Sequence, residues 1–590
     1  FTWTGASNNN WDEQLNWSTG DGSDGDDGIP LNSDDVIIGI GTPVVNAANL
    51  VANDLTISGG SLTISPGITL DIEGDFLMTG GTLIFQNSTF DCAGSWNDFS
   101  GALDMQGTST VNLDGNGTIS KNSAATSDFI FLNISGNYSA ATNVKIIGSF
   151  DITTGSLDIG AFTVECTGAD VTIANVATLI LSDPAGIFLS NNSIDNNGGI
   201  VFTDNGTFDA NAGFLSDGTG TITFHTLAGS GGTLQLAATD PDLGSSFTAN
   251  EGTVEYDLST GGTTQDIDEV TYNNLTIIGS AANDVKKVNY ATLDVDGDLT
   301  VTSGTLDLAN SGGVSENNTI DLEGDYSMAA GAFDPGTSDL HNVAGIWNET
   351  GGVFQPTDGT FTFSGTGGKT IVQNAGNNFL DLTIASGGTD KISANSPISV
   401  GGVFTNTNGT FDTEGNTVTV TGATNIDGGI LEIAAGTFDA NGDFNANGAN
   451  VTFTGTGILK LGGNDGTTPD LGTLDATTND GTVEYDFNGN QGVFDATYHH
   501  LEIDNNTGTA TAGSALGVEG NLTVTTGNLT LNNIALTLGG NFVLTSGTFV
   551  PGNADHIVSG DWTETGGTTF EATAGKFTFN GAPSTITTDA

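Results

Sequence analysis

The chain has 590 residues, of which 70 are acidic and eight are Lys, with no Arg, so its formal net charge is −62. This charge argues against a nucleic-acid-binding protein, because phosphates need a basic surface, and it disfavours contact with anionic membranes. No run of about 18 apolar residues is present, so we expect no membrane insertion.

Residues 1–45 differ from the rest of the chain and are predicted to form an N-terminal cap that includes an acidic loop. They contain Trp3, Trp11 and Trp17, half of the six Trp residues. The end of a repeat protein exposes apolar side chains and unpaired strand edges, which need a cover. We therefore expect the three Trp side chains to cap that end or to take part in assembly, and a carbohydrate-binding platform is the alternative.

The acidic loop is the candidate metal site, and calcium is the cofactor that its residues would suit. Asp21, Asp24, Asp26 and Asp27 alternate with Gly and Ser in the run DGSDGDDG. Calcium takes about six to eight oxygen ligands, which a flexible run of Asp can supply. The spacing does not match the EF-hand loop, and a solvated loop without metal is the alternative.

Residues 46–590 are predicted to form one continuous parallel β-helix, or β-solenoid, in an all-β protein. Glycines recur at a period near 20 residues, as in Gly402, Gly422, Gly442 and Gly462, and again in Gly520, Gly540, Gly560 and Gly581. A fixed period of this length indicates a chain wound into equal coils, each of which is stable only when stacked on its neighbours. Alternating apolar and polar residues between the turns predict three short strands in each coil of about 20 residues.

A longer repeat overlies the short one and predicts about four duplicated supermodules, with approximate starts at residues 117, 252, 359 and 481. The phrase GTVEYD occurs at residues 252 and 481, and each copy is followed by a GDLTVTSGTL-like phrase and then by a Trp phrase. The C-terminal phrase GKFTFNG resembles the opening of the supermodule at residue 359. We therefore expect an incomplete last repeat, so that either a further segment has been removed or this end meets another subunit.

Residues that could support catalysis or metal binding are few. The chain lacks the Arg and the clustered Lys that β-helix enzymes use on acidic polysaccharides, so we expect no enzyme. His499 and His500 are adjacent and are expected to point to opposite faces of a strand, which prevents them from chelating one ion. Cys92 and Cys166 are 74 residues apart, too many coils for a disulfide, and are expected to be buried.

The phrases WTGASNNNWDEQLNW, DDVII, YNNLTI and GDLTVTSGTLDL resemble those of repetitive secreted bacterial surface proteins, namely large adhesins and filamentous-haemagglutinin-like β-helix proteins. The resemblance implies an extracellular or cell-surface protein, and the absence of an initiating Met fits a mature product after signal-peptide removal. We expect an acidic structural rod that assembles with itself, head to tail, into a filament. An adhesin stalk or glycan-binding surface protein is the alternative, and a polysaccharide-active enzyme is a third interpretation.

Overall fold

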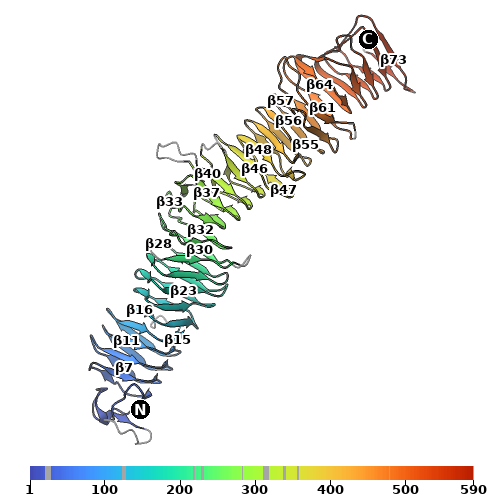
Figure 1. The fold of residues 1–590 in the computed structure, drawn as a ribbon. Coiled ribbons are helices and arrows are strands. Elements are labelled where there is room, and N and C mark those ends of the chain that lie inside the picture. Colours follow the sequence, from blue (N-terminus) through green and yellow to red (C-terminus); the bar gives the residue numbers. More distant parts are fainter. Residues whose placement is uncertain are drawn as a thin grey trace. The chain divides into compact units, whose positions relative to one another are not determined.

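The computed structural model describes residues 1–19, 28–122, 128–216, 220–226, 231–281, 283–309, 318–336, 340–354, 356, 358–477, 479–581 and 583–588. The chain divides into two compact units, Phe1–Lys287 and Val288–Ala590, and each is a parallel β-solenoid (Figure 1). Within the described ranges the only helix is the 3₁₀ turn η1 (Gln14–Asn16). Accordingly, no helix in this part of the chain has the length and apolar character needed to cross a membrane.

A regular coil contributes one strand to each of three sheets, as predicted. In unit 1, β7 (Ser61–Ile64), β8 (Thr69–Ile72) and β9 (Phe76–Met78) are followed one coil later by β10 (Thr82–Gln86), β11 (Thr89–Cys92) and β12 (Trp96–Asp98). Corresponding strands pair in parallel, with Leu62 opposite Leu83 and Phe76 opposite Trp96. These partners are 21 and 20 residues apart, so the glycine period is the length of one coil.

The sheet of unit 1 that carries the site described below consists of nine parallel strands in coil order. Its strands are β5 (Leu50–Ala52), β8, β11, β14 (Thr110–Leu113), β16 (Phe131–Ile134), β19 (Phe150–Ile152), β22 (Val171–Ile173), β25 (Ile194–Asn196) and β28 (Phe214–Ser216).

Unit 2 repeats this arrangement of parallel strands. One sheet contains β37 (Thr292–Val295), β40 (Thr319–Leu322), β43 (His341–Val343), β46 (Thr360–Phe363), β48 (Asp381–Ala385), β51 (Phe404–Asn408), β54 (Thr424–Ile426) and β57 (Phe444–Asn445). Another contains β50 (Ile398–Val400), β53 (Thr417–Val420), β56 (Thr437–Ala440), β59 (Ile458–Leu461), β61 (Thr482–Tyr485), β64 (His500–Ala512), β66 (Leu522–Thr530), β68 (Phe542–Leu544), β71 (Trp562–Glu564) and β74 (Ile586–Thr587). A third contains β63 (Thr497–Tyr498), β65 (Leu516–Val518), β67 (Leu536–Leu538), β70 (Asp555–Val558) and β73 (Lys576–Phe579).

The core is a column of inward side chains from successive coils. Residues along each strand alternate between buried and partly exposed, as in β8, where Leu70 and Ile72 are fully buried. Aromatic rings stack between coils, with the centroid of Phe76 4.4 Å from that of Trp96. Burying one such side chain contributes about 1.5–3 kcal/mol, so stacking on a neighbouring coil stabilises each coil.

The recurrent glycines lie where consecutive coils approach most closely. The amide of Gly540 donates to the carbonyl of Gly520 at 2.8 Å, and that of Gly560 donates to Gly540 at 3.0 Å. A Cβ atom on Gly540 would lie 2.4 Å from the Gly520 oxygen, which explains why glycine recurs there.

In the other predicted series, the last member needs correction. Gly463, and not Gly462, stacks on Gly442, since a Cβ on Gly463 would lie 2.1 Å from the Gly442 oxygen. Next to Gly520 and Gly540, the side chain of the following residue adds a hydrogen bond between the same two coils. The Asn521 side chain accepts from the Asn541 amide at 3.0 Å, and Asn541 accepts from Asp561 at 2.8 Å.

The Trp-rich N-terminus closes the first coil, as the fold prediction required. Strand β1 (Thr2–Trp3) pairs in parallel with β3 (Val36–Ile38) and antiparallel with β2 (Trp17–Ser18), so the direction of pairing reverses at this edge. The amide of Trp11 donates to the Val44 carbonyl at 2.9 Å and covers the edge of a second sheet. The cap therefore supplies the hydrogen bonds that a preceding coil would otherwise provide.

The two GTVEYD phrases each form a strand whose Tyr pairs with a second buried tyrosine further along the chain. The hydroxyls of Tyr256 and Tyr272 lie 2.7 Å apart in unit 1, and those of Tyr485 and Tyr498 lie 3.0 Å apart in unit 2. Equivalent phrases thus occupy equivalent positions in their coils. The four supermodule boundaries themselves stay a prediction.

Candidate functional site

The candidate calcium ligands Asp21, Asp24, Asp26 and Asp27 lie outside the described residues. Calcium binding there stays a prediction. Within the described ranges, no group of three or more His, Cys, Asp or Glu side chains is arranged to hold a metal ion.

The three N-terminal Trp side chains pack on one another. The ring centroid of Trp17 lies 5.0 Å from that of Trp3 and 4.8 Å from that of Trp11. Their exposed fractions are 2% for Trp3, 0% for Trp11 and 8% for Trp17. Since a sugar ring needs an open aromatic face for stacking, these side chains fit a cap better than a carbohydrate platform.

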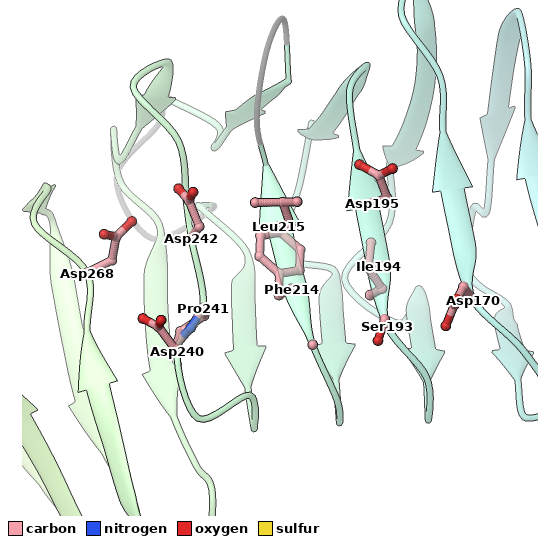
Figure 2. Close-up of a pocket in the computed structure, with 11 residues that line it drawn as sticks. Asp170, Ser193, Ile194, Asp195, Phe214, Leu215, Asp240, Pro241, Asp242 and Asp268 are labelled. Atoms are coloured by element: carbon pink, nitrogen blue, oxygen red, sulfur yellow. The ribbon is translucent and has the colours of Figure 1, made fainter.

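An open groove of about 640 Å³ lies on unit 1, where the nine-stranded sheet ends (Figure 2). Strands β25 and β28 form one part of it, and the loop that contains Pro241 forms another. Beyond β28 the pairing shrinks to an isolated bridge between Leu215 and Asp242. The groove is therefore a consequence of a break in the regular stacking of coils.

The groove is acidic. Among the described residues that line it, five are aspartates and none is basic; the aspartates are Asp170, Asp195, Asp240, Asp242 and Asp268. Ile194 and Phe214 are buried beneath, and Leu215 is 40% exposed. Figure 2 shows the carboxylates distributed along the groove, with the apolar side chains between them.

Some of these carboxylates accept hydrogen bonds from backbone amides. The Asp268 side chain accepts from the Leu243 amide at 2.7 Å, and that of Asp242 accepts from Gly244 at 2.8 Å. Burial raises the pKa of Asp268, and the charges of Asp242 and Asp240 raise it further against the hydrogen bonds that lower it. The groove therefore favours a ligand that is cationic or rich in hydroxyl groups and disfavours an anionic one.

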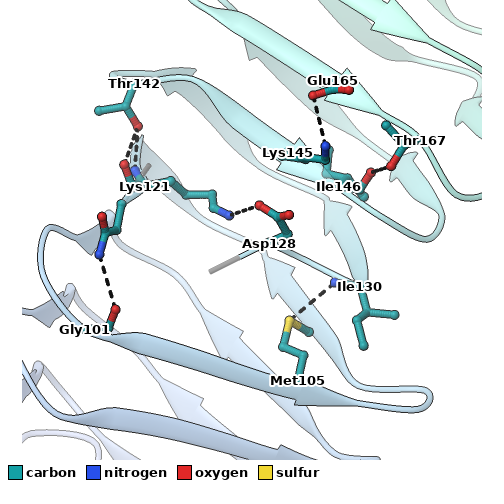
Figure 3. Close-up of polar contacts among 11 residues, drawn as sticks. Gly101, Met105, Lys121, Asp128, Ile130, Thr142, Lys145, Ile146, Glu165 and Thr167 are labelled. Atoms are coloured by element: carbon teal, nitrogen blue, oxygen red, sulfur yellow. Dashed lines mark hydrogen bonds and ion pairs between the residues drawn. The ribbon is translucent and has the colours of Figure 1, made fainter. Parts of the chain in front are cut away.

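A second hollow, of about 420 Å³, is lined by two of the eight lysines, Lys121 and Lys145. Figure 3 shows the ion pairs of these two side chains. Lys121 lies 3.6 Å from the carboxylate of Asp128 and 4.7 Å from the centroid of the Phe129 ring. Burial lowers the pKa of Lys121 to about 8, although the charges of Asp128 and Asp98 oppose the shift. Lys145 pairs with Glu165 at 3.4 Å. Both ammonium groups are thus neutralised within the fold.

The histidine pair has a different geometry from the one predicted. The rings of His499 and His500 lie 4.5 Å apart, because β63 ends at Tyr498 and β64 begins only at His500, which leaves His499 at a corner. The Nε2 atom of His499 lies 3.1 Å from Asp480, and Nδ1 of His500 accepts from the Asn521 amide at 2.9 Å. The two side chains therefore have separate partners.

Two further histidines and both cysteines lie in the core. His341 stacks on Phe361 and His556 stacks on Phe577, with ring centroids 4.5 Å apart in both pairs. Cys92 and Cys166 are buried free thiols. Burial raises the pKa of Cys92 to about 12, so this thiol is unreactive at neutral pH.

Sequence reasoning missed a buried carboxylate next to the repeated Trp. Trp347 donates to Glu349 at 2.7 Å, and Glu349, which is 1% exposed, also accepts from the side chain of Asn377 at 2.7 Å. Trp562 and Glu564 repeat the first bond at 2.7 Å. Burial raises the pKa of Glu349 against these hydrogen bonds. The signal was available, because Trp and Glu two residues apart on a strand share a face.

Comparison with known proteins gives one relative. A stretch of 227 residues is 28% identical to the protein named Adhesin BmaC autotransporter of Brucella suis biovar 1 (strain 1330). The stretch covers 37% of this chain but only 6% of that protein, so this chain corresponds to a small part of its relative. No protein family matches the sequence, and no solved structure matches the chain significantly. The sequence and the stacked coils together identify a repetitive, adhesin-like β-solenoid, as the resemblance predicted.

Proposed function

We propose that this chain is a stalk segment of a bacterial cell-surface or secreted adhesin and that it acts without catalysis. One observation carries the proposal: within each unit, strands pair with the strands of the coils before and after them. Such a stack grows in one direction only and holds distant points apart. The similarity to an autotransporter adhesin supports a location outside the cytoplasm.

Deletion of whole coils tests this proposal. Removing residues 402–441 takes out 40 residues between two ladder glycines, which corresponds to two coils or about 10 Å of stack. We expect this variant to keep its circular dichroism per residue and to shorten by about that length in electron micrographs. Removing residues 402–431 breaks the register and should destabilise unit 2. Equal stability of the two deletion variants would contradict the stalk model.

The acidic groove favours a second candidate function, binding of a neutral or cationic glycan. Its carboxylates can accept hydrogen bonds from the amino or hydroxyl groups of a sugar chain, and its exposed Leu215 can pack against a sugar ring. The negative charge of the groove opposes the binding of uronic acids. A panel of immobilised glycans tests this idea with the double variant Asp170→Asn and Asp240→Asn. Binding that survives this double substitution would locate the glycan elsewhere, and release of a cleaved product would instead indicate an enzyme.

Head-to-tail assembly of copies into a filament is a finer form of the stalk proposal. The exposed apolar side chains of the last coil of unit 2 support it, with Phe570 37% and Ile586 55% exposed. The buried N-terminal Trp cluster does not offer a complementary open coil. Filaments of constant width in electron micrographs would support assembly, and monomers at high protein concentration would contradict it.

We further propose that calcium binds the acidic loop at Asp21, Asp24, Asp26 and Asp27. The concentration of Asp in this run supports the proposal. Calcium titration followed by calorimetry should give saturable binding that Asp24→Asn with Asp26→Asn weakens. Unchanged binding in that variant would contradict this assignment.

A further inference from the structure

Lys121 and Asp128 lie where the regular stacking of coils in unit 1 is interrupted. The four-stranded sheet of the first coils ends at β13 (Ala102–Gln106). At the corresponding position of the next coil, the described residues form only an isolated bridge, between Phe129 and Ile146. Residues 121 and 128 therefore lie next to a position at which, among the described residues, the ladder of strand hydrogen bonds is incomplete.

The amine of Lys121 lies in an apolar enclosure beside this interruption. Its side chain is 2% exposed, and its Nζ atom is 3.6 Å from Oδ1 of Asp128, whose side chain is 18% exposed. Figure 3 shows the Lys121 side chain extended towards that carboxylate. Nζ also lies over the ring of Phe129, and the ring of Trp96 lies 5.3 Å from that of Phe129. The amine and the carboxylate are thus held together at a place that water reaches poorly.

Other lysines form ion pairs in a more solvated setting. The side chains of Lys145, Lys391 and Lys460 are 42%, 37% and 31% exposed. Water stabilises both charges of such pairs, whereas a buried pair has lost most of its hydration free energy. The Lys121–Asp128 pair therefore gains the most from a reaction that removes both charges.

A second buried carboxylate lies beside Lys121. The parallel pairing of β12 with β15 (Asn116–Ser120) places Asn97 opposite Ser120, so the next residues, Asp98 and Lys121, are neighbours on adjacent coils. Asp98 is fully buried, and its charge acts on Lys121. Burial lowers the pKa of Lys121 to about 8, so a fraction of this amine is neutral near neutral pH and can act as a nucleophile.

We propose that Lys121 and Asp128 condense to form an intramolecular amide bond, with Asp98 as the proton carrier. The ammonium group of the ion pair first transfers a proton to the Asp128 carboxylate. Nζ then attacks Cγ of Asp128 and forms the new C–N bond. Asp98 accepts a proton from the nitrogen and returns it to the hydroxyl on Cγ, whose C–O bond breaks so that water leaves.

The overall step balances without an oxidant or a cofactor. One ammonium group and one carboxylate become one amide and one water, so the formal net charge of the chain stays at −62. The fixed geometry replaces a bimolecular encounter, and the loss of two buried charges favours the product. The amide joins residues 121 and 128 covalently where regular strand pairing is interrupted, and so secures the coil at that place.

Mass spectrometry of the purified full chain tests this proposal directly. We expect an intact mass that is lower than the sequence mass by one water. No Lys or Arg precedes Lys121, so trypsin acting on the denatured chain releases peptide 1–121 if this amine is free. If the amine is linked, trypsin cannot cut there and releases peptide 1–145, which should lack backbone fragment ions between residues 121 and 128. Lys391, which pairs with Asp412 at 2.8 Å, should be cut normally and is the matched control.

Three variants separate the amide from other losses of water. Lys121→Arg keeps the positive charge and Asp128→Ser removes the acceptor, and each should restore the full mass. Asp98→Asn should leave most chains unlinked, and Asp98→Glu should restore the link. A full intact mass with peptide 1–121 as the main product would overturn the proposal. A loss of water that persists in Lys121→Arg, or a chain that hydroxylamine cleaves at the dehydrated residue, would indicate a succinimide and would also overturn it.

Discussion

Substitution of Gly540 by Ala tests the stacking of coils at one defined contact. The added Cβ would lie 2.4 Å from the Gly520 oxygen, about 1 Å closer than ordinary contact, so the two coils must separate locally. A shift of that size breaks the bond from the Gly540 amide to Gly520, now 2.8 Å, and the bond from the Asn541 amide to Asn521, now 3.0 Å. At about 1–1.5 kcal/mol for each bond, the local cost is about 2–3 kcal/mol.

Native-state hydrogen exchange measures this cost locally, which matters because long repeat arrays do not unfold in two states. Amides of the coils around residues 520–545 should exchange about 30- to 150-fold faster in Gly540→Ala, since about 1.4 kcal/mol corresponds to a factor of ten. Gly513→Ala is the control, because a Cβ there has no neighbour within 4 Å. Equal exchange rates in the two variants would refute the reasoning.

Three further predictions concern buried charges. Glu349→Gln places an amide group against the donors of Trp347 and Asn377, and should lower the free energy of unfolding measured by heating by about 2 kcal/mol. The loss should be larger than for Glu564→Gln, because the bond from Trp562 to Glu564 is only part-buried. Equal losses in the two variants would contradict this account. Lys121→Met leaves Asp98 and Asp128 without their cation, and should destabilise unit 1 by about 3–5 kcal/mol; a neutral effect in the same assay would remove Lys121 from the account of the fold. Burial, with neighbouring carboxylates, raises the pKa of Asp257 and of Asp486 to about 6. Between about pH 4 and 6 the folded state therefore binds protons that the unfolded state releases. At pH 7 each charged side chain destabilises the fold by about 1–2 kcal/mol after solvent screening. Acidification from pH 7 to 5 should therefore raise stability, and Asp257→Asn with Asp486→Asn should raise it at pH 7 and flatten that rise; a double variant with an unchanged pH profile would contradict the assignment.

Protonation of His341 changes stability in the opposite direction and lowers it at acidic pH. Burial lowers its pKa to about 4, so its contribution is complete above pH 6.5 and is lost as the pH falls towards 4, by about 3 kcal/mol. His341→Phe introduces the residue found at the equivalent position 90 and should reduce this acid sensitivity. Unfolding midpoints measured between pH 4 and 7 provide the check. If the variant loses as much stability in acid as the original protein, groups other than His341 control the acid sensitivity.

The architecture was predictable because it depends on local, periodic features. Gly520, Gly540 and Gly560 mark contacts between coils, and the alternation of residues such as Leu70 and Ile72 fixes which side chains enter the core. The difference between Gly462 and Gly463 was not predictable, because either glycine satisfies the period and only the stacked backbone selects one. Equally, the corner at His499 depends on where a strand stops, which alternation does not specify.

The groove could not be predicted from the sequence. Asp170 and Asp268 are 98 residues apart and line one surface only because several coils stack between them and the regular sheet ends at β28. In a chain with 70 acidic residues, no single Asp is distinctive. The inward position of Glu349 could have been recognised from the sequence, because a charged residue stands there where the alternation predicts an apolar one.

The most direct measurement of the central claim, that the chain is a stack of coils in register, is a series of distances between spin labels in unit 2. Outward positions Thr419 and Thr523 are five pairing steps apart in one sheet, and Thr419 and Thr563 are seven. At about 4.8 Å for each step, cysteine-labelled pairs should give backbone separations of ~24 Å and ~34 Å, with Cys92 and Cys166 replaced. Distances that increase in proportion to the number of coils are the predicted result, and distances unrelated to that number would contradict the account.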